Sequence, residues 1–417
     1  MANLNKSHSL LWIVFLTIFI DMLGIGILIP VFPLLITHGS EFLVSPSTWT
    51  QAQSYIFAGW LLSIYPLCQF FCTPILGQLS DRYGRRKLLI LSIAGTAFSY
   101  ILFAIGILTK NLYLLFIARI LDGISGGNIS IAQAIIGDLS LAEHRARNFG
   151  MVGVAIGVGF VCGPFLGGKL SDPHFISWFN AATPFWFASI LSLINLVLII
   201  WKLAESNLSP NNQAVDYSRA INNLIKIFTL ANLRQIIPVL FLYNAGFTFF
   251  TAFWGVILIK QFGFTQATVG NFFAYLGIMI ILAQGGVVRR ISAYATDYKV
   301  LRYSFILTGL CLLVYYVIPD HQISLIYLVP PFLALATALS KAFSSSLLTR
   351  IAPNNRLGEV MGINSSANAL AQFFPPLLAG YLTNYHLRLP VLIGAILVLM
   401  ASLIFICNIW RKPNNYA

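Results

Sequence analysis

Four ionisable side chains lie inside long apolar stretches of this sequence, namely Asp21, Arg119, Asp122 and Lys341. A charge at the centre of a membrane-spanning helix costs about 2.5–3.5 kcal/mol on insertion scales, so each needs a partner or a watery cavity. Burial favours the protonated form of a carboxyl group, and a neighbouring guanidinium favours the charged form. We therefore expect Asp21 and Asp122 to exchange protons, with Arg119 setting their proton affinity.

The spacing of Arg119 and Asp122 has a second interpretation. Residues three apart share one face of a helix, where opposite charges pair readily. The two side chains could therefore form a permanent structural ion pair. For Asp21 a functional role is favoured over a structural pair, as is general for acids inside membranes.

Lys341 stands in the stretch ATALSKAFSSSLLTR, about eight residues from the inner end of an apolar run. One interpretation is that it reaches the membrane interface or pairs with an acid. The other places a positive group in a cavity, where it would attract an anionic or zwitterionic substrate. With Arg119 opposite, such a cavity would suit a carboxylate.

Further candidates for substrate contact are polar and aromatic. Tyr243, Asn244 and Phe247 fall on one helix face, and Gln284 is a polar residue in the next apolar run. Most residues of these types simply fill space between helices or face lipid. Asn368, four residues after Asn364, could equally bond a neighbouring helix.

These residues must be positioned by helices that cross a membrane. The chain has 417 residues, of which 58% are hydrophobic and only 9% charged, against about 25% charged in soluble domains. A spanning helix needs about 20 mostly apolar residues, and backbone polar groups in lipid require helices. The sequence predicts twelve spans, at 9–37, 51–79, 88–108, 111–137, 148–171, 183–203, 234–260, 266–290, 299–318, 322–349, 357–384 and 389–410.

The spans fall into two groups of six. The longest polar stretch, 204–233, predicts a linker with an amphipathic piece near 217–230 between domains at 1–203 and 234–417. A faint repeat supports this division, because span five ends VCGPFLGG and span eleven ends FFPPLLAG. The first span could mimic a secretory signal, but no small-residue cleavage site follows it, so we expect it to be retained.

The orientation follows from the distribution of Lys and Arg. If both termini are cytoplasmic, most of the 25 basic residues lie inside. The outside then receives only Lys110, Lys169, Lys260 and Arg388. This asymmetry accounts for the net charge of +13 through topology and attraction to anionic lipid, and it requires no nucleic acid.

A charged cytoplasmic turn joins spans two and three. The sequence GQLSDRYGRRKLLI resembles the loop signature of the major facilitator superfamily. The resemblance implies that this loop locks spans two and eleven in the outward-open form, with its arginines contacting neighbouring acids such as Asp138, at the inner end of span four. The residues of this expected conformational gate are Gly77, Asp81, Arg82, Gly84, Arg85, Arg86 and Asp138.

Two further motifs support the resemblance. L115-x-x-x-R119 with D122-G123 is similar to the span-four signature of the family, although Asp122 stands where a neutral residue is usual. Span five is similar to the signature of the drug:H⁺ antiporter branch. Small residues allow helices to approach closely, and proline kinks a helix. The motif comprises Gly150, Gly159, Gly163, Pro164, Gly167 and Gly168.

Span one, from Asp21 through Gly24 and Gly26 to Pro33, resembles the tetracycline-exporter group. In that group, acids in spans three and nine are important for tetracycline, and spans three and nine of this sequence have no acid. The resemblance implies an all-α membrane protein with two six-helix bundles, in which spans one and four line a central cavity. Helix rise places Asp21 about 18 Å from one surface and Arg119 about 12 Å from the other, hence both near the midplane, where such transporters hold their sites.

These observations predict a proton-coupled secondary transporter that exports small organic molecules or drugs by alternating access. The alternative is a proton-linked carrier for one metabolite, such as an organic acid or carboxylate siderophore, including uptake. We expect no enzyme, metal or cofactor, since no catalytic or Cys/His motif occurs. We do not expect a channel, because the sequence lacks a selectivity-filter repeat. We do not expect a sensor, because a sensor would need a long soluble domain or tail. The expected partners are the substrate, protons and lipids, for a monomer in the inner membrane of the cell.

Overall fold

The computed structural model describes residues 2–36, 44, 46, 48–140, 145–206, 215–229, 233–292, 294–352 and 357–410. Within this described part, eleven helices are long and apolar enough to cross a membrane. The remaining predicted span, the eleventh in chain order, is also a helix, α15 (Leu357–Leu382). Its asparagines, serines and paired prolines make it less apolar than the others. The chain is an all-α, multi-pass membrane protein.

The chain divides into two compact units, each described here by itself. Unit 1 contains Met1–Trp49, Ile64–Arg219 and Thr265–Ala274, and unit 2 contains Thr50–Ser63, Ala220–Phe264 and Tyr275–Ala417. Two helices therefore contribute to both units, α2 (Gln51–Tyr83) and α10 (Gln266–Leu282). The change of unit after Arg219 falls inside the linker expected at 204–233.

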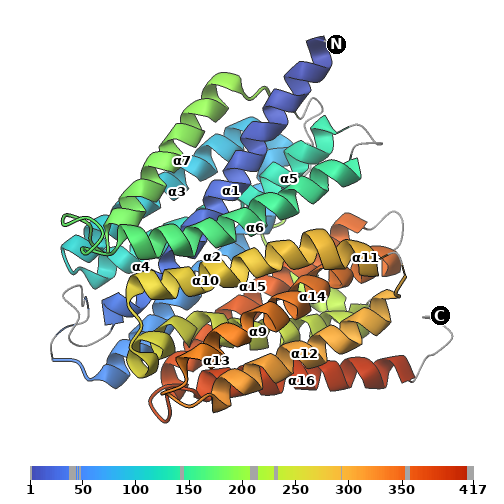
Figure 1. The fold of residues 1–417 in the computed structure, drawn as a ribbon. Helices are drawn as coiled ribbons and strands as arrows, with labels where there is room; N and C mark the ends of the chain where they lie inside the picture. Colours follow the sequence, from blue (N-terminus) through green and yellow to red (C-terminus); the bar gives the residue numbers. More distant parts are fainter. Residues whose placement is uncertain are drawn as a thin grey trace. The chain divides into compact units, whose positions relative to one another are not determined.

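Unit 1 is built around α1 (Ala2–Ile36), which packs most closely on α6. Figure 1 shows these two helices side by side. Leucines, isoleucines and phenylalanines of α1 and its neighbours form a continuous buried cluster at one end of the unit. The remaining helices of this unit are α3 (Arg85–Leu108), α4 (Leu112–Ser125), α5 (Asn128–Leu139), α6 (Arg145–Leu170) and α7 (Thr183–Lys202).

Unit 2 centres on α9, which packs against α15 and α16. The α10 helix continues as a π-helical segment, η1 (Ala283–Val288), and then as α11 (Arg289–Ile291). The amphipathic piece expected in the linker is the helix α8 (Arg219–Thr229). The other helices are α9 (Leu233–Phe262), α12 (Asp297–Val317), α13 (Ile323–Leu328), α14 (Pro330–Ile351) and α16 (Leu389–Trp410).

The fourth predicted span is not one helix but two. The α4 helix ends at Ser125 and α5 begins at Asn128, with Gly126 and Gly127 between them. Glycine has the highest cost in a helix interior of any residue except proline, so a glycine pair favours such an interruption. The break leaves backbone groups that must find other partners in lipid. This break was not predicted from the sequence.

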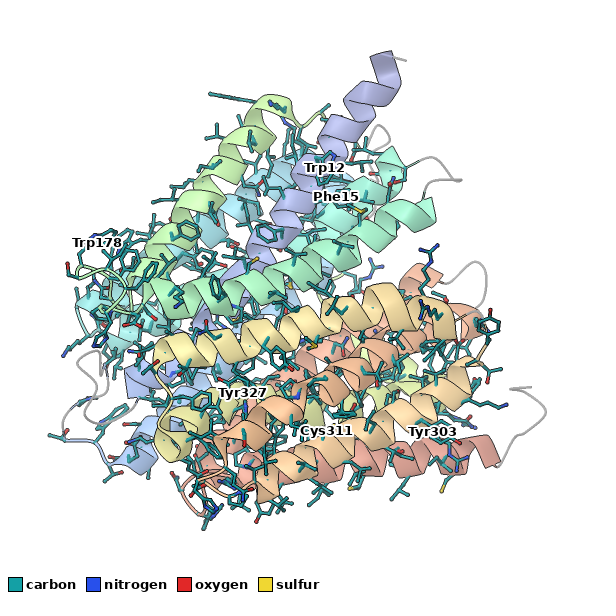
Figure 2. The ribbon with its side chains drawn as sticks, in the orientation of Figure 1. Trp12, Phe15, Trp178, Tyr303, Cys311 and Tyr327 are labelled. Carbon is teal, nitrogen blue, oxygen red and sulfur yellow. The ribbon has the colours of Figure 1, made fainter. Side chains whose placement is uncertain are left out.

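Exposed aromatic side chains lie near the ends of the helices in each unit. Trp12 near the start of α1 and Trp178 in the α6–α7 connection are both exposed, and Figure 2 shows them at opposite ends of unit 1. In unit 2, Tyr303 and Tyr327 are likewise far apart along the helices (Figure 2). Tryptophan and tyrosine favour the two interfaces of a membrane, which fits the helices as membrane spans.

Candidate functional site

Asp21 lies in the interior of unit 1, and only 5% of its surface is exposed. The Asn128 side-chain amide donates a 2.5 Å hydrogen bond from Nδ2 to Asp21 Oδ1. Asn128 is the first residue of α5 and is completely buried. The break after α4 thus places an amide against the one carboxyl group of span one. Sequence reasoning missed Asn128, although a polar residue after a glycine pair in an apolar span is a usable signal.

Arg119 and Asp122 form the ion pair that their spacing permits. Arg119 Nη1 lies 3.1 Å from Asp122 Oδ2, and the two side chains are only 11% and 8% exposed. The guanidinium also lies over the ring of Tyr65, 4.6 Å from its centroid. The pair and the ring both stabilise the cation. This geometry is consistent with both interpretations, a structural pair and a charge that responds to protonation.

Gln69 of α2 forms a hydrogen bond to the backbone at the break in span four. Gln69 Nε2 donates to the Gly126 carbonyl oxygen at 3.0 Å and to the Tyr65 hydroxyl at 3.2 Å. One side chain therefore satisfies a carbonyl at the break and holds the tyrosine that covers Arg119. Neither Gln69 nor this role of Tyr65 was predicted, because their partners are distant in sequence.

Tyr100 of α3 is a second tyrosine in the same region. Its hydroxyl lies against the backbone of α1 at Gly24, where any side chain would collide with it. Tyr100, Tyr65, Asp21 and Asp122 are close enough to interact electrostatically. Unit 1 therefore holds two acids, one arginine and two phenols in one buried cluster. Such a cluster can hold or release a proton at either acid.

The charged turn between spans two and three forms a separate cluster. Asp81 Oδ1 lies 3.1 Å from Arg85 Nη1, and Asp138 Oδ2 lies 2.5 Å from Arg85 Nε. Gly84 separates α2 from α3 with φ +103, a backbone conformation that favours glycine. The structure therefore brings together Asp81, Arg85 and Asp138, the acid named from the family resemblance.

Glu205, just after α7, is a member of this cluster that sequence reasoning missed. Its carboxylate accepts the backbone N–H of Arg85 at 2.9 Å and that of Arg86 at 3.2 Å. These are unpaired donors at the start of α3, which an acid satisfies while complementing the helix dipole. Ser206 donates to Asp138 Oδ2 at 3.1 Å. The start of the linker is thus bonded directly to the charged turn.

Among the residues that the structure describes, the other predicted gate residues do not take part in this ion-pair cluster through their side chains. Arg86 Nη2 donates to the Ile200 carbonyl oxygen at 2.6 Å, and the Arg82 guanidinium lies 5.4 Å from the Tyr83 ring centroid. No atom lies within 4 Å of a Cβ built at Gly77. In the described part of the chain, Gly77 therefore has no packing contact that requires glycine.

The glycines of α6 permit close helix packing. A Cβ at Gly159 or Gly163 would meet the backbone of α1, and one at Gly167 would lie 2.6 Å from the Ile27 carbonyl oxygen. Pro164 packs against Gly26 of α1. Gly168 instead faces Gly270 of α10, where the Cβ separation from its Cα would be 3.1 Å. Gly150 lies in α6, but its surroundings fall outside the described residues.

In unit 2 the predicted substrate residues do not share one face. Tyr243 is buried, stacks on Phe305 of α12 at 4.5 Å between ring centroids, and lies 3.3 Å from the Thr308 hydroxyl. Asn244 Nδ2 instead donates to Asn368 Oδ1 of α15 at 2.6 Å. Adjacent residues on a helix point about 100° apart, so the expectation of one shared surface is wrong for this pair.

The remaining candidates of unit 2 are more open. Phe247 is half-buried, with its ring 6.0 Å from that of Phe250. Gln284 is half-buried within η1, and π-helical segments frequently occur at functional sites. Lys341 on α14 is exposed. Among the described residues, no acid lies within ion-pair distance of its ammonium group, so the alternative of pairing with an acid finds no support there.

No group of three or more His, Cys, Asp or Glu residues in the described part of the chain is placed to hold a metal ion.

Comparisons with known proteins agree with this architecture. Residues 14–329 and 296–416 match the Major Facilitator Superfamily. The chain is 28% identical over 411 residues to the class H tetracycline resistance protein of Pasteurella multocida, covering 95% of each. It is 26% identical over 413 residues to multidrug resistance protein 1 of Bacillus subtilis, covering 99% of each. The human organic anion transporter MFSD10 has a similar fold, with a TM-score of 0.72 and 24% identity, covering 96% of this chain and 99% of that one.

Proposed function

Because this chain belongs to the major facilitator superfamily, we propose that it is a proton-coupled secondary transporter that exports small organic molecules or drugs by alternating access. Its curated relatives include tetracycline and multidrug resistance proteins. We place it in the inner membrane with both termini cytoplasmic, as a monomer that needs only its substrate, protons and lipid.

One observation carries the proposal, which is the burial of Asp21 and Asp122 in the same polar cluster with Arg119. Acids enclosed in a membrane are costly and are retained for a function. Of the two acids, Asp21 has no cationic partner among the described residues, whereas Asp122 has Arg119. Asp21 is therefore the proposed proton carrier, and the state of the Arg119–Asp122 pair sets its affinity through the local field.

The test is transport by the purified protein in proteoliposomes, with a proton gradient as the only driving force. Asp21→Asn keeps the shape of the side chain and removes its charge, and it should abolish proton-driven export while substrate exchange continues. Asp172→Asn is the matched control, because Asp172 is an acid of unit 1 that lies just after α6, outside the spans. Proton-driven export that continues undiminished in Asp21→Asn would refute the proposed role.

We further propose that the charged turn controls access from the cytoplasm. Its support is the pair Arg85–Asp138 and the bonds from Glu205 and Ser206, which tie α3, α5 and the linker together. A cluster that joins separate elements has to rearrange when those elements move. Asp138→Asn should therefore change the rate of transport more than the affinity for substrate.

Lys341 favours a second candidate function, the carriage of an organic acid or a carboxylate siderophore. A lysine on a spanning helix, with no acid pairing it in the described residues, would attract a carboxylate. A transport panel of organic cations and organic acids, in the native protein and in Lys341→Ala, separates the two candidates. Loss of acid transport alone in Lys341→Ala supports the second, and unaltered transport of every compound excludes it.

A further inference from the structure

Two buried oxygen atoms of unit 1 lack hydrogen-bond partners. They are Asp21 Oδ2 and Asn128 Oδ1, and neither has a donor among the residues that the structure describes. Both belong to side chains that already meet through their other atoms, in the 2.5 Å bond from Asn128 Nδ2 to Asp21 Oδ1. An unsatisfied buried acceptor costs about 1–3 kcal/mol, and more if it is charged. Two of them at one contact call for a common explanation.

A carboxylic acid and a primary amide have complementary edges. The amide offers one N–H donor and one carbonyl acceptor, and a protonated carboxyl group offers one acceptor and one O–H donor. When they meet edge to edge, two hydrogen bonds close a ring. A carboxylate cannot do this, because both of its oxygens are acceptors and one of them then faces the amide oxygen. A single proton on Asp21 Oδ2 would satisfy both unpaired atoms.

We infer that Asn128 is the positioning residue for the transported proton, which Asp21 Oδ2 holds and donates to Asn128 Oδ1 in a closed acid–amide pair. This inference rests on the proposed function and identifies how the proton is bound. Uptake forms an O–H bond on Asp21 with a proton from hydronium, which becomes water, and neutralises the carboxylate. Release breaks that bond, returns the proton to water as hydronium, and removes one of the two hydrogen bonds between α1 and α5.

The surroundings of Asp21 make Asn128 the natural partner. The ionisable groups that interact electrostatically with Asp21 are Asp122 of α4, Tyr65 of α2 and Tyr100 of α3, and Arg119 of α4 interacts with both tyrosines. Arg119 is paired with Asp122. The α6 and α7 helices also pack on α1, but Lys169 and Lys202 lie in their last turns. Among the described residues, Asn128 is the side chain that hydrogen-bonds the Asp21 carboxyl group.

The position of Asn128 gives the pair a mechanical consequence. Asn128 begins α5 directly after the Gly126–Gly127 break, so it can turn with little resistance from a continuous helix. The protonated pair holds α1 and α5 together by two hydrogen bonds, and the ionised pair by one. Proton binding therefore tightens the contact between the first span and the second half of the fourth, which is a physical route from protonation to helix movement.

The test is the infrared difference spectrum between acidic and alkaline pH for the full chain in lipid membranes. Protonation should produce a carboxylic acid band that Asp21→Asn removes. A second band, from a side-chain amide carbonyl that gains a hydrogen bond on protonation and therefore absorbs at lower frequency, should shift when asparagine carries a heavy-carbon label. The amide band should vanish in Asp21→Asn and in Asn128→Leu.

Asn195→Leu is the matched control. Asn195 is also completely buried and also bonds α1, through the Thr17 hydroxyl at 3.0 Å, but it does not touch a carboxyl group. Its replacement should leave the amide band unchanged. If Asn128→Leu fails to fold, the labelled native chain compared with labelled Asp21→Asn still decides whether an amide responds to the proton on Asp21.

The outcomes separate the two proposals. An Asp21 band without an amide band overturns the acid–amide pair and leaves Asp21 as the proton carrier. The absence of any carboxylic band sensitive to Asp21→Asn overturns both. Loss of the amide band in Asn195→Leu would show that the band arises from Asn195 and not from Asn128, which overturns the acid–amide pair. An amide band induced by sodium chloride at constant pH would make the site one for a metal cation, which also overturns it.

Discussion

Arg350 Nε lies 3.1 Å from Asp297 Oδ2, and this ion pair joins the end of α14 to the start of α12. In the first half of the chain, Arg85 at the start of α3 pairs with Asp138 at the end of α5. The third and fourth spans are therefore linked in the same way as the ninth and tenth, with the two charges exchanged. The two halves of the chain therefore each contain an ion pair at the corresponding place.

Because acid and base exchange places between the two halves, we predict that stability depends on opposite charges at these two positions and not on which position carries the acid. Arg350→Asp places two acids together and should lower thermal stability. Because Arg350 is 70% exposed, the attractive part of the pair is worth only about 0.2–1 kcal/mol. The double variant Asp297→Arg with Arg350→Asp should recover part of the loss. Thermal unfolding in detergent measures all three proteins, and no recovery in the double variant would contradict the prediction.

Gly163 is predicted to tolerate no side chain. A Cβ there would lie 2.6 Å from the Leu23 carbonyl oxygen and 2.8 Å from the Gly26 Cα, both of the α1 backbone, which cannot move aside as a side chain can. Gly163→Ala should destabilise the protein by about 1–3 kcal/mol through overpacking. Gly153→Ala on the same helix is the control, since no atom lies within 4 Å of its Cβ position. It should be neutral or stabilising by up to about 1 kcal/mol.

Glu205 is predicted to stabilise the start of α3. Glu205→Ala removes the acceptor for the Arg85 and Arg86 amides, and the loss should be comparable to that of a helix N-cap, about 0.5–2 kcal/mol. Glu205→Gln keeps one acceptor oxygen without the charge and should cost less. Thermal unfolding midpoints rank the three proteins, and equal midpoints for alanine and glutamine would show that the charge alone matters.

The Arg119–Asp122 pair is predicted to show strong coupling. Removing one partner of a buried pair leaves an uncompensated charge and costs about 3–5 kcal/mol. Arg119→Gln should therefore destabilise the protein far more than Arg119→Gln combined with Asp122→Asn. The same variants measured for proton-driven transport decide the role of the pair. If the double variant transports normally, the pair is structural.

The sequence by itself determined most features that depend on neighbouring residues, although the break at Gly126 and Gly127 was not predicted. Runs of apolar residues predicted the spans, glycine spacing predicted the close packing of α6, and a spacing of three predicted the Arg119–Asp122 pair. The linker helix α8 was visible from its amphipathic pattern. These features arise from helix geometry and from the cost of exposing polar groups to lipid, both of which act locally along the chain.

Only the tertiary structure decided which distant side chains meet. Asn128 bonds Asp21 across 107 positions of the chain, and Glu205 bonds the Arg85 amide across 120. In the same way, Tyr243 contacts α12 whereas the adjacent Asn244 bonds α15. Periodicity indicates which face of a helix a residue occupies, but the neighbour on that face depends on how the helices pack, and that is set by the sum of many weak contacts rather than by any short stretch of sequence.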